Sequence, residues 1–424
     1  MTRPHLPRRA RLRVALALAA GGILLATCRP PPFDPGPVSP VPPVDSSEVE
    51  AVLLLVGDAG DAVVERSPLV HRLRADVERW SARLPADTSV AVVFLGDNVY
   101  PWGLRDRDHP ARPADSARLH AQVWAVSGPE ARRDGTPGLF LPGNHDWGPR
   151  TGPAGRARLG NQARFLERIG ADGGPAVAMV PPPGGPGPVV VELGDAARLV
   201  LLDTEWWIRR GPGEGRDRVL EGLQEALSAG GDRPTVVAAH HPLFSGGPHA
   251  ERGILDPLGL LARAGAVVQD RSAAPYAALV EGLTGVFGRV GPPLVYAAGH
   301  DHVLQVLEAT APDQPRWSLV SGAASKISHV TDVPGLLWAA EAPGYMRLLF
   351  RRDGAVEVHV EQVDPEYLRC GGDGAVRTRC LQAGLAAFRT EYTRRLRAGE
   401  EAAGTGAALR PTRSPALTPP TPPR

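Results

Sequence analysis

The sequence predicts an α/β domain built around two packed sheets. Its 424 residues are 43% hydrophobic, which is enough for a sizeable core in one large domain or two ordinary ones. Short apolar runs alternate with segments whose apolar residues have helical spacing through most of the chain. A later part has the pattern of several consecutive strands. The alternation predicts strands covered by helices, and the late strands predict a second layer of sheet.

The individual elements follow from apolar runs and helical spacing. The predicted strands are 51–56, the run from residue 89 to the turn at 96–97, 139–141, 189–193, 199–203, 235–239, 294–298, 317–320, 346–350 and 356–360. The predicted helices are 67–84, 113–126, 162–169, 218–227, 254–264, 275–287 and 381–396. Two stretches rich in Gly with Arg or Pro, 150–160 and 173–188, predict irregular connections.

Residues 1–28 are expected to be a targeting segment. Four arginines between positions 8 and 13 precede an apolar run over 14–26, which is short for a membrane span. The run ends in Leu25-Ala26-Thr27-Cys28, which resembles a bacterial lipobox whose Cys28 would be acylated, although Thr27 departs from the usual small residue. Ordinary signal cleavage and a single membrane-anchor helix are the alternatives. All three place the rest of the chain outside the cytoplasm, as an anchored lipoprotein of the bacterial cell envelope or as a periplasmic or secreted protein.

The folded domain is expected over residues 49–366, between less regular segments. Residues 29–48 are Pro-rich and predict an extended tether. Residues 367–398 form a C-terminal extension that contains the last predicted helix, and in an oxidising compartment its Cys370 and Cys380 are expected to form a disulfide. Residues 399–424 are Ala, Thr and Pro with few anchors, which predicts a disordered tail.

Charge and missing motifs exclude several classes of function. The formal net charge of +1 gives no electrostatic basis for binding nucleic acid, so no nucleic-acid partner is expected. The sequence has no G-x-x-x-x-G-K-[ST] loop and no G-x-S-x-G elbow, so nucleotide-driven and serine-hydrolase chemistry have no support. Nothing in the sequence indicates the oligomeric state.

Five of the predicted strands end in side chains that can bind a metal. In SVAVVFLGDNVY, residues 89–100, Gly96 permits a sharp turn and Asp97 follows where the strand leaves the sheet. Ligands collect at the carboxyl ends of strands in an open α/β sheet. Similar strand ends carry GDAG, GNHD, HHP and GHDH. The candidate metal ligands are Asp58, Asp97, Tyr100, Asn144, His240, His300 and His302.

These side chains indicate a centre with two metal ions. Hard oxygen donors and imidazoles suit iron, zinc or manganese rather than copper(I). One ion rarely needs more than six ligands, so two ions that share a carboxylate explain the size of the set. Each motif is weak alone, because an Asp after a strand is commonly a turn former. Their occurrence in order, each after an apolar run, argues against coincidence.

In order and form, GDAG, GDNVY, GNHD, VAAH and GHDH resemble the motifs of the calcineurin-like metallophosphoesterases. The Tyr of GDNVY is similar to that of the purple acid phosphatases, and LGDNVY, GHDHVLQ and LVSGA most resemble the small, tartrate-resistant type. The resemblance covers residues 52–325. It implies the metallophosphoesterase fold, a four-layer α/β/β/α sandwich of two mixed sheets flanked by helices.

The resemblance also implies which residues hold each ion. The residues that would hold a ferric ion are Asp58, Asp97, Tyr100 and His302. The residues that would hold a divalent ion, Fe²⁺, Zn²⁺ or Mn²⁺, are Asn144, His240, His300 and the bridging Asp97.

Two further histidines would act on the substrate in an enzyme of this type. His145 would face the substrate, and His249 stands at the spacing of a second pocket histidine, although the GGP before it departs from the pattern. His241 also departs, because the small enzymes usually carry Tyr there. Asp146 and Asp301 are expected to orient the neighbouring histidine side chains.

The implied function is hydrolysis of phosphomonoesters by an exported phosphatase. A metal-activated hydroxide would attack phosphorus in line, and a histidine would protonate the leaving alkoxide. One alternative is a phosphodiesterase or nucleotide hydrolase with the same metals. A comparison of its activity on bis-ester and mono-ester substrates would distinguish it from a phosphomonoesterase. The other is a surface binding module that keeps the fold without turnover, and the complete ligand set argues against it.

Overall fold

The computed structural model describes residues 44–84, 89–149, 153–209, 213–250, 261 and 268–397. The predicted targeting segment, most of the predicted tether, the predicted tail and nearly all of the helix predicted over 254–264 lie outside the described residues. Among the helices that are described, none has the length and apolar character needed to cross a membrane.

The described chain alternates between strands and helices, as expected. The strands are β1 Val49–Val56, β2 Ser89–Phe94, β3 Gly138–Phe140, β4 Val177–Met179, β5 Val189–Leu193, β6 Ala197–Leu201, β7 Thr235–Ala238, β8 Val295–Ala298, β9 Leu304–Glu308, β10 Trp317–Ser321, β11 Leu336–Ala340, β12 Gly344–Arg351, β13 Val356–Gln362 and β14 Arg389–Arg397. The helices are α2 Pro68–Arg83, α3 Arg112–Ala125, α4 Pro129–Asp134, α5 Asn144–Trp147, α6 Pro153–Ala171, α7 Thr204–Arg209, α8 Glu214–Ser228, α10 Ala274–Val290 and α11 Gly374–Ala387, with short 3₁₀ turns at Ser46–Glu48 and Pro365–Tyr367.

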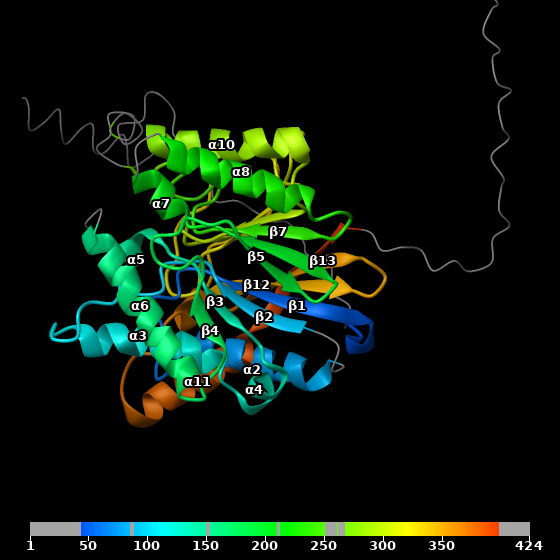
Figure 1. The fold of residues 1–424 in the computed structure, drawn as a ribbon. Helices are drawn as coiled ribbons and strands as arrows, with labels where there is room; N and C mark the ends of the chain where they lie inside the picture. The colour runs from blue at the N-terminus through cyan, green and yellow to red at the C-terminus, as the bar shows by residue number, and fades with distance from the viewer. Residues whose placement is uncertain are drawn as a thin grey trace, which may run out of the picture.

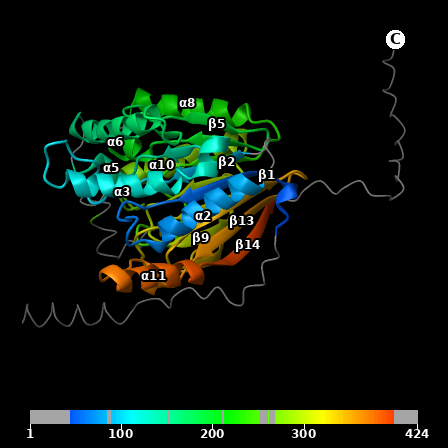
Figure 2. The same ribbon diagram turned by 90° about the horizontal axis from the view of Figure 1, so that it is seen from below.

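Two mixed seven-stranded sheets lie face to face between two layers of helices (Figure 1). The first sheet has the order β14-β13-β12-β1-β2-β3-β4, and the second has the order β11-β9-β10-β8-β7-β6-β5. Helices α2, α3, α4, α6 and α11 lie on the side of the first sheet, while α7, α8 and α10 cover the second (Figures 1 and 2). The predicted α/β/β/α sandwich of two mixed sheets is confirmed.

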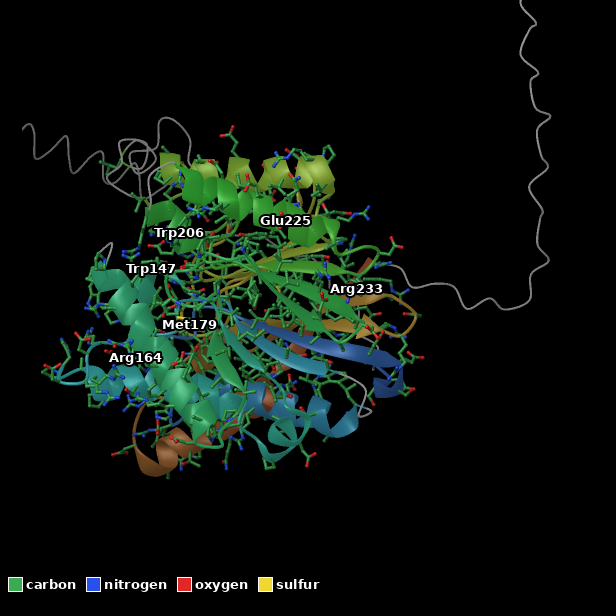
Figure 3. All side chains as sticks on the ribbon, in the orientation of Figure 1. Trp147, Arg164, Met179, Trp206, Glu225 and Arg233 are labelled. Carbon is green, nitrogen blue, oxygen red and sulfur yellow. A yellow bond between two sulfur atoms is a disulfide. The ribbon has the colours of Figure 1, made fainter. Side chains whose placement is uncertain are left out.

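The alternating faces of β1 show how the layers form. Leu53 and Leu55 pack in the core between the two sheets, whereas Val52 and Leu54 pack in the cluster that contains α2. A strand buried on both faces reads as one continuous apolar run, which is why the sequence located β1 and β2. Side chains fill the space between the layers, and the labelled Trp147 and Trp206 are both buried (Figure 3).

Three local predictions were wrong. Helix α6 begins at Pro153, so most of the Gly- and Arg-rich stretch is helical, and the Pro-rich stretch contains the short strand β4. The helix predicted over 381–396 ends at Ala387, and β14 follows. Its sequence RTEYTRRLR has only weak apolar periodicity, and antiparallel pairing with β13 makes it the edge strand. Strands β9 and β11 and helix α7 were not predicted from the sequence.

Cys370 and Cys380 form a disulfide, as the sequence predicted. It joins the loop before α11 to the helix itself, and α11 packs against α2. The C-terminal extension therefore completes the first sheet and part of its helical layer.

Candidate metal centre

The predicted ligands lie in loops that leave β1, β2, β3, β7 and β8 at one edge of the sandwich. Asp58, Asp97 and His300 have φ angles of 60°, 53° and 67°, and they are the residues other than glycine with positive φ in the described part of the chain. Left-handed backbone is costly for such residues and persists where surrounding structure enforces it. The fold accepts that cost at three of the candidate ligands.

Glycines in the motifs allow these loops to approach one another closely. A Cβ atom on Gly143 would lie 2.3 Å from the backbone nitrogen of Asp97, and one on Gly299 would lie 2.6 Å from the Asp58 carboxylate. The Gly of GNHD and the Gly of GHDH are therefore required because a neighbouring strand end occupies the space of a side chain.

One group of candidate ligands contains Asp58, Tyr100 and His302. The Tyr100 hydroxyl donates to Asp58 Oδ1 over 2.8 Å and lies 3.1 Å from His302 Nε2. His302 Nε2 is 3.5 Å from the same carboxylate oxygen. Three of the four side chains that the resemblance assigned to a ferric ion therefore meet at one point.

A second group contains Asn144, His240 and His300. His240 Nε2 and His300 Nδ1 lie 3.0 and 3.1 Å from Asn144 Oδ1, and 3.2 Å from each other. The other nitrogen of each ring faces a backbone carbonyl: His240 Nδ1 is 2.8 Å from the Leu95 oxygen and His300 Nε2 is 3.1 Å from the Gln269 oxygen. A carbonyl only accepts, so those nitrogens carry the protons. The nitrogens that face Asn144 therefore present lone pairs.

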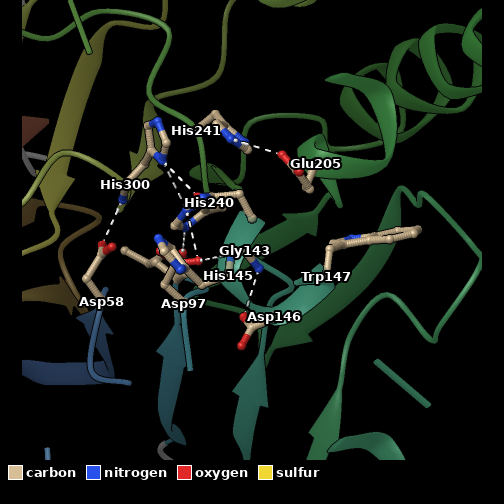
Figure 4. A network of polar contacts seen from close by, with 12 residues as sticks. Asp58, Asp97, Gly143, His145, Asp146, Trp147, Glu205, His240, His241 and His300 are labelled. Atoms are coloured by element: carbon tan, nitrogen blue, oxygen red, sulfur yellow. Dashed lines mark hydrogen bonds and ion pairs between the residues drawn. The ribbon is translucent and has the colours of Figure 1, made fainter. Parts of the chain in front are cut away.

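Asp97 lies beside Asp58 of the first group and His240 of the second (Figure 4). Its Oδ1 is 3.5 Å from His240 Nε2, and carboxylate oxygens of Asp58 and Asp97 fall within 4.8 Å of a ring nitrogen of His240 and of each other. The backbone N–H of His145 donates to Asp97 Oδ1 over 2.8 Å, which fixes the carboxylate. Asp97 is thus placed to be shared by two cations.

Burial controls the charges of this centre. Burial and the nearby Asp97 raise the pKa of Asp58 well above its usual value. Burial also favours neutral Asp97, but His240 and His145 outweigh it and lower the pKa of Asp97. Burial lowers the pKa values of His240 and His300, and burial with Lys326 lowers the pKa of His302 to about 4. The imidazoles are neutral at physiological pH, which is the form that binds metal.

The donor set fits two metal ions. Carboxylates, a phenol, an amide oxygen and neutral imidazoles surround the space, and two of the carboxylates are buried beside each other. The Tyr100 hydroxyl donates to Asp58, but the lone pairs of Asn144, His240 and His300 face one another without a donor among them. Burying them beside two carboxylates is costly, and a cation removes that cost. Which residues ligate remains a prediction from the motifs.

Both predicted substrate histidines lie beside this centre. His145 Nδ1 donates to the Pro101 carbonyl over 2.7 Å, which turns Nε2 toward Asp97 at 3.9 Å. Its side chain is 31% exposed, so an incoming ligand can reach it. The His249 ring lies 4.4 Å from the His300 ring, and the His249 backbone N–H donates to Asp301.

Asp146 and Asp301 contact backbone and hydroxyl groups rather than histidine rings. Asp146 accepts hydrogen bonds from the backbone N–H groups of Asn98, Val99 and Gly143, so it joins two motif loops. Asp301 accepts from the Ser245 hydroxyl. The expectation that they orient the neighbouring histidine rings is wrong. Each of these Asp side chains points toward backbone and hydroxyl groups of the loops rather than toward the ring of the histidine beside it in the sequence.

Sequence reasoning missed two features near the centre. Lys326 places its Nζ 3.2 Å from the centroid of the Tyr100 ring, and the signal available was that it is the single lysine of the chain. His241 is fully buried and its Nε2 lies 2.8 Å from Gln269 Oε1 and 3.5 Å from Glu205 Oε2. One nitrogen of His241 also falls within 4.8 Å of ligand atoms of His240 and His300. The HHP motif marked this position without indicating its partners.

No protein-family model matches the chain, and no curated protein matches it. Among solved structures it is similar to GAP50, "the anchor in the inner membrane complex of Plasmodium", at 14% identity over 81% of this chain and 96% of that chain, with a TM-score of 0.48. It is also similar to the purple acid phosphatase PPD1 of yellow lupin seeds, at 13% identity over 76% of this chain and 52% of that chain, with a TM-score of 0.47. Similarity at this level shows neither the family nor the activity of the chain.

Proposed function

We propose that the chain is an exported, metal-dependent phosphatase that hydrolyses phosphomonoesters with water at a dinuclear centre. The observation that carries the proposal is the convergence of Asn144 Oδ1, His240 Nε2 and His300 Nδ1 within 3.0–3.2 Å of one another, with both ring protons directed elsewhere. Three lone pairs without a donor between them form a site for a cation. Asp97 connects this site to the acidic group around Asp58.

In this proposal each ion has its own side chains and both share Asp97. A ferric ion would be held by Asp58, Asp97, Tyr100 and His302. A divalent ion, Fe²⁺, Zn²⁺ or Mn²⁺, would be held by Asp97, Asn144, His240 and His300. When bound, such a pair lowers the pKa of water and offsets charge on a phosphoryl group.

The chain's own residues would then position and protonate the substrate. The Pro101 carbonyl fixes the proton of His145 on Nδ1, so Nε2 faces the centre and, in the imidazolium form, can donate to a leaving oxygen. The His249 ring lies 4.4 Å from the His300 ring and would contact the phosphoryl group. Export rests on residues 1–28, with Cys28 as the acylation site if the lipobox is used; loss of membrane association in Cys28→Ser would support the lipid anchor.

Metal analysis and a visible spectrum of the purified chain test the centre directly. We expect iron with a second metal, and an absorption band from the Tyr100 phenolate bound to ferric iron, which Tyr100→Phe abolishes. A protein that binds metal without iron and without this band would lose the purple-phosphatase assignment but keep a dinuclear centre.

Asn144→Ala tests the activity. The substitution removes one of the converging lone pairs, so hydrolysis of p-nitrophenyl phosphate should fall by about 100-fold or more, since even indirect partners of a metal site cost 10–100-fold. Asn161→Ala is the matched control. Asn161 is half-buried on α6 and donates to Leu104 and Asp106 rather than to a candidate ligand, so this variant should keep its activity. Equal residual activity in Asn144→Ala and wild type would favour a binding module, and faster cleavage of bis(p-nitrophenyl) phosphate would favour a phosphodiesterase.

A further inference from the structure

A second polar cavity lies on the outer face of the first sheet, beneath α2. It has a volume of about 370 Å³ and is lined by Arg72, Arg79 and Arg83 of α2 and by Arg347 of β12, and it also reaches Val44 and Thr390. We call it the arginine pocket. It shares no residue with the metal centre. Helix α2, which covers the arginine pocket, faces the viewer in Figure 2.

Positive charge exceeds negative charge around the arginine pocket. Asp76 Oδ1 lies 2.7 Å from Arg79 and 3.4 Å from Arg72, and Asp76 Oδ2 lies 3.4 Å from Arg347. Glu361 lies 2.9 Å from Arg72 and 3.0 Å from Arg347. Among the described residues, these two carboxylates neutralise two of the four guanidinium groups that line the pocket, which leaves an excess of about two positive charges. Arg83 is exposed.

Three residues that line the pocket also carry buried donors without acceptors. The Nε atoms of Arg79 and Arg347 and the indole Nε1 of Trp80 are buried, and none has a hydrogen-bond partner among the described residues. Arg347 and Trp80 are only 4% and 6% exposed. A buried N–H group without an acceptor is costly, and native structures contain few of them. All three are donors, so the missing partner is an acceptor.

We propose that the arginine pocket binds a phosphate-type oxyanion. Guanidinium groups recognise phosphate through paired N–H donors, and a tetrahedral oxyanion presents acceptor atoms in several directions at once. The cavity is larger than one phosphate requires, so the phosphate can carry an organic group. Free phosphate and the phosphate of a lipid headgroup share this chemistry. This proposal is independent of the proposed catalytic activity.

Calorimetric titration of the full-length chain with inorganic phosphate tests the anion site. Wild type should bind phosphate in the pocket, and Arg83→Gln and Arg79→Gln should each weaken that binding by about tenfold or more, the usual effect of losing a charged hydrogen bond. Arg168→Gln on the exposed surface of α6 removes the same charge and should change nothing. Any phosphate that binds at the metal centre should bind equally in all of these variants. A defect of the proposed catalytic centre therefore leaves the difference between the variants unchanged, whereas absence of the anion site removes it.

Vesicle sedimentation with Cys28→Ser separates the two sources of phosphate. If a lipid headgroup is the ligand, the chain should sediment with vesicles of phosphatidylcholine and phosphatidic acid but not with phosphatidylcholine alone, and Arg83→Gln should reduce the bound fraction. If free phosphate is the ligand, little protein sediments with either kind of vesicle. Only the calorimetric phosphate affinity then differs between wild type and the Arg79→Gln and Arg83→Gln variants. The proposal is overturned if Arg79→Gln and Arg83→Gln match Arg168→Gln in both assays, or if neither probe binds.

Discussion

The metal centre and the arginine pocket show opposite mismatches of hydrogen bonding. The centre lies where strand ends of both sheets meet, and the pocket lies on the outer face of the first sheet. In the centre, lone pairs of His240, His300 and Asn144 face one another without a proton between them. In the pocket, N–H groups of Arg79, Arg347 and Trp80 are buried without an acceptor. Each mismatch identifies the charge of the missing partner, a cation in the first case and an anion in the second.

The two regions also differ in how they are built. The centre stands on loops with left-handed backbone at Asp58, Asp97 and His300, so its geometry depends on the contacts between strand ends. The pocket stands on helix α2 and on strands β12 and β13, in which no residue other than glycine has a positive φ angle, and its order depends on ion pairs with Asp76 and Glu361. Substitutions in the pocket should therefore change stability more than activity, and those in the centre should do the reverse.

The largest expected effect on stability comes from Asp76→Asn. Asp76 is buried and accepts from Arg79, Arg347 and the Tyr345 hydroxyl. Loss of its charge leaves cations buried without a partner, which should lower the free energy of unfolding by about 3–5 kcal/mol in urea denaturation. The exposed Asp313→Asn is the control. Hydrolysis per folded molecule should stay unchanged; if activity falls with stability intact, the pocket and the centre are not the separate regions described above.

An intermediate effect is expected from pH on the metal-depleted centre. The pKa of His302 is about 4 in the folded chain against 6.5 for an unperturbed His, so the unfolded chain binds more protons between these values. The free energy of unfolding of chelator-treated protein should therefore rise as pH rises from about 4 to about 6.5, by about 3 kcal/mol at most.

His302→Gln should flatten that rise, whereas His329→Gln should not, because the His329 side chain is 70% exposed. Urea denaturation at pH 4.5, 5.5 and 6.5 measures the slope. Identical slopes in His302→Gln and wild type would mean that burial at the centre does not keep this imidazole neutral.

The smallest expected effect is that of Lys326, the cation within the acceptor-rich centre. Its ammonium group contacts the Tyr100 ring and faces the charges of Asp58 and Asp97. Lys326→Met should lower the free energy of unfolding of chelator-treated protein by about 1 kcal/mol, and Lys326→Arg should restore most of it. Addition of metal should reduce the difference, because bound cations then neutralise the same carboxylates. An equal loss with and without metal would assign Lys326 a packing role only.

Sequence patterns located the layers, the strand ends and the edge strand β5, but not the edge strands β4, β11 and β14. Strands such as β1 and β2 are buried on both faces, so their sequences are apolar runs that stand out locally. Strand β14 is an edge strand whose residues are exposed or half-buried except Leu396. Its sequence was mistaken for a helix because its pairing partner β13 lies outside the local stretch of sequence that suggested the helix.

The sequence by itself determined that Asp58, Asp97, Asn144, His240 and His300 stand at strand ends, because a metal-capable side chain directly after an apolar run is a local pattern. Only the tertiary structure decided which of these side chains meet and which ring nitrogens carry protons, because both depend on backbone carbonyls from other loops. The arginine pocket was decided entirely by the tertiary structure. Its central pair, Asp76 and Arg347, is separated by 271 positions and meets only where α2 crosses the sheet.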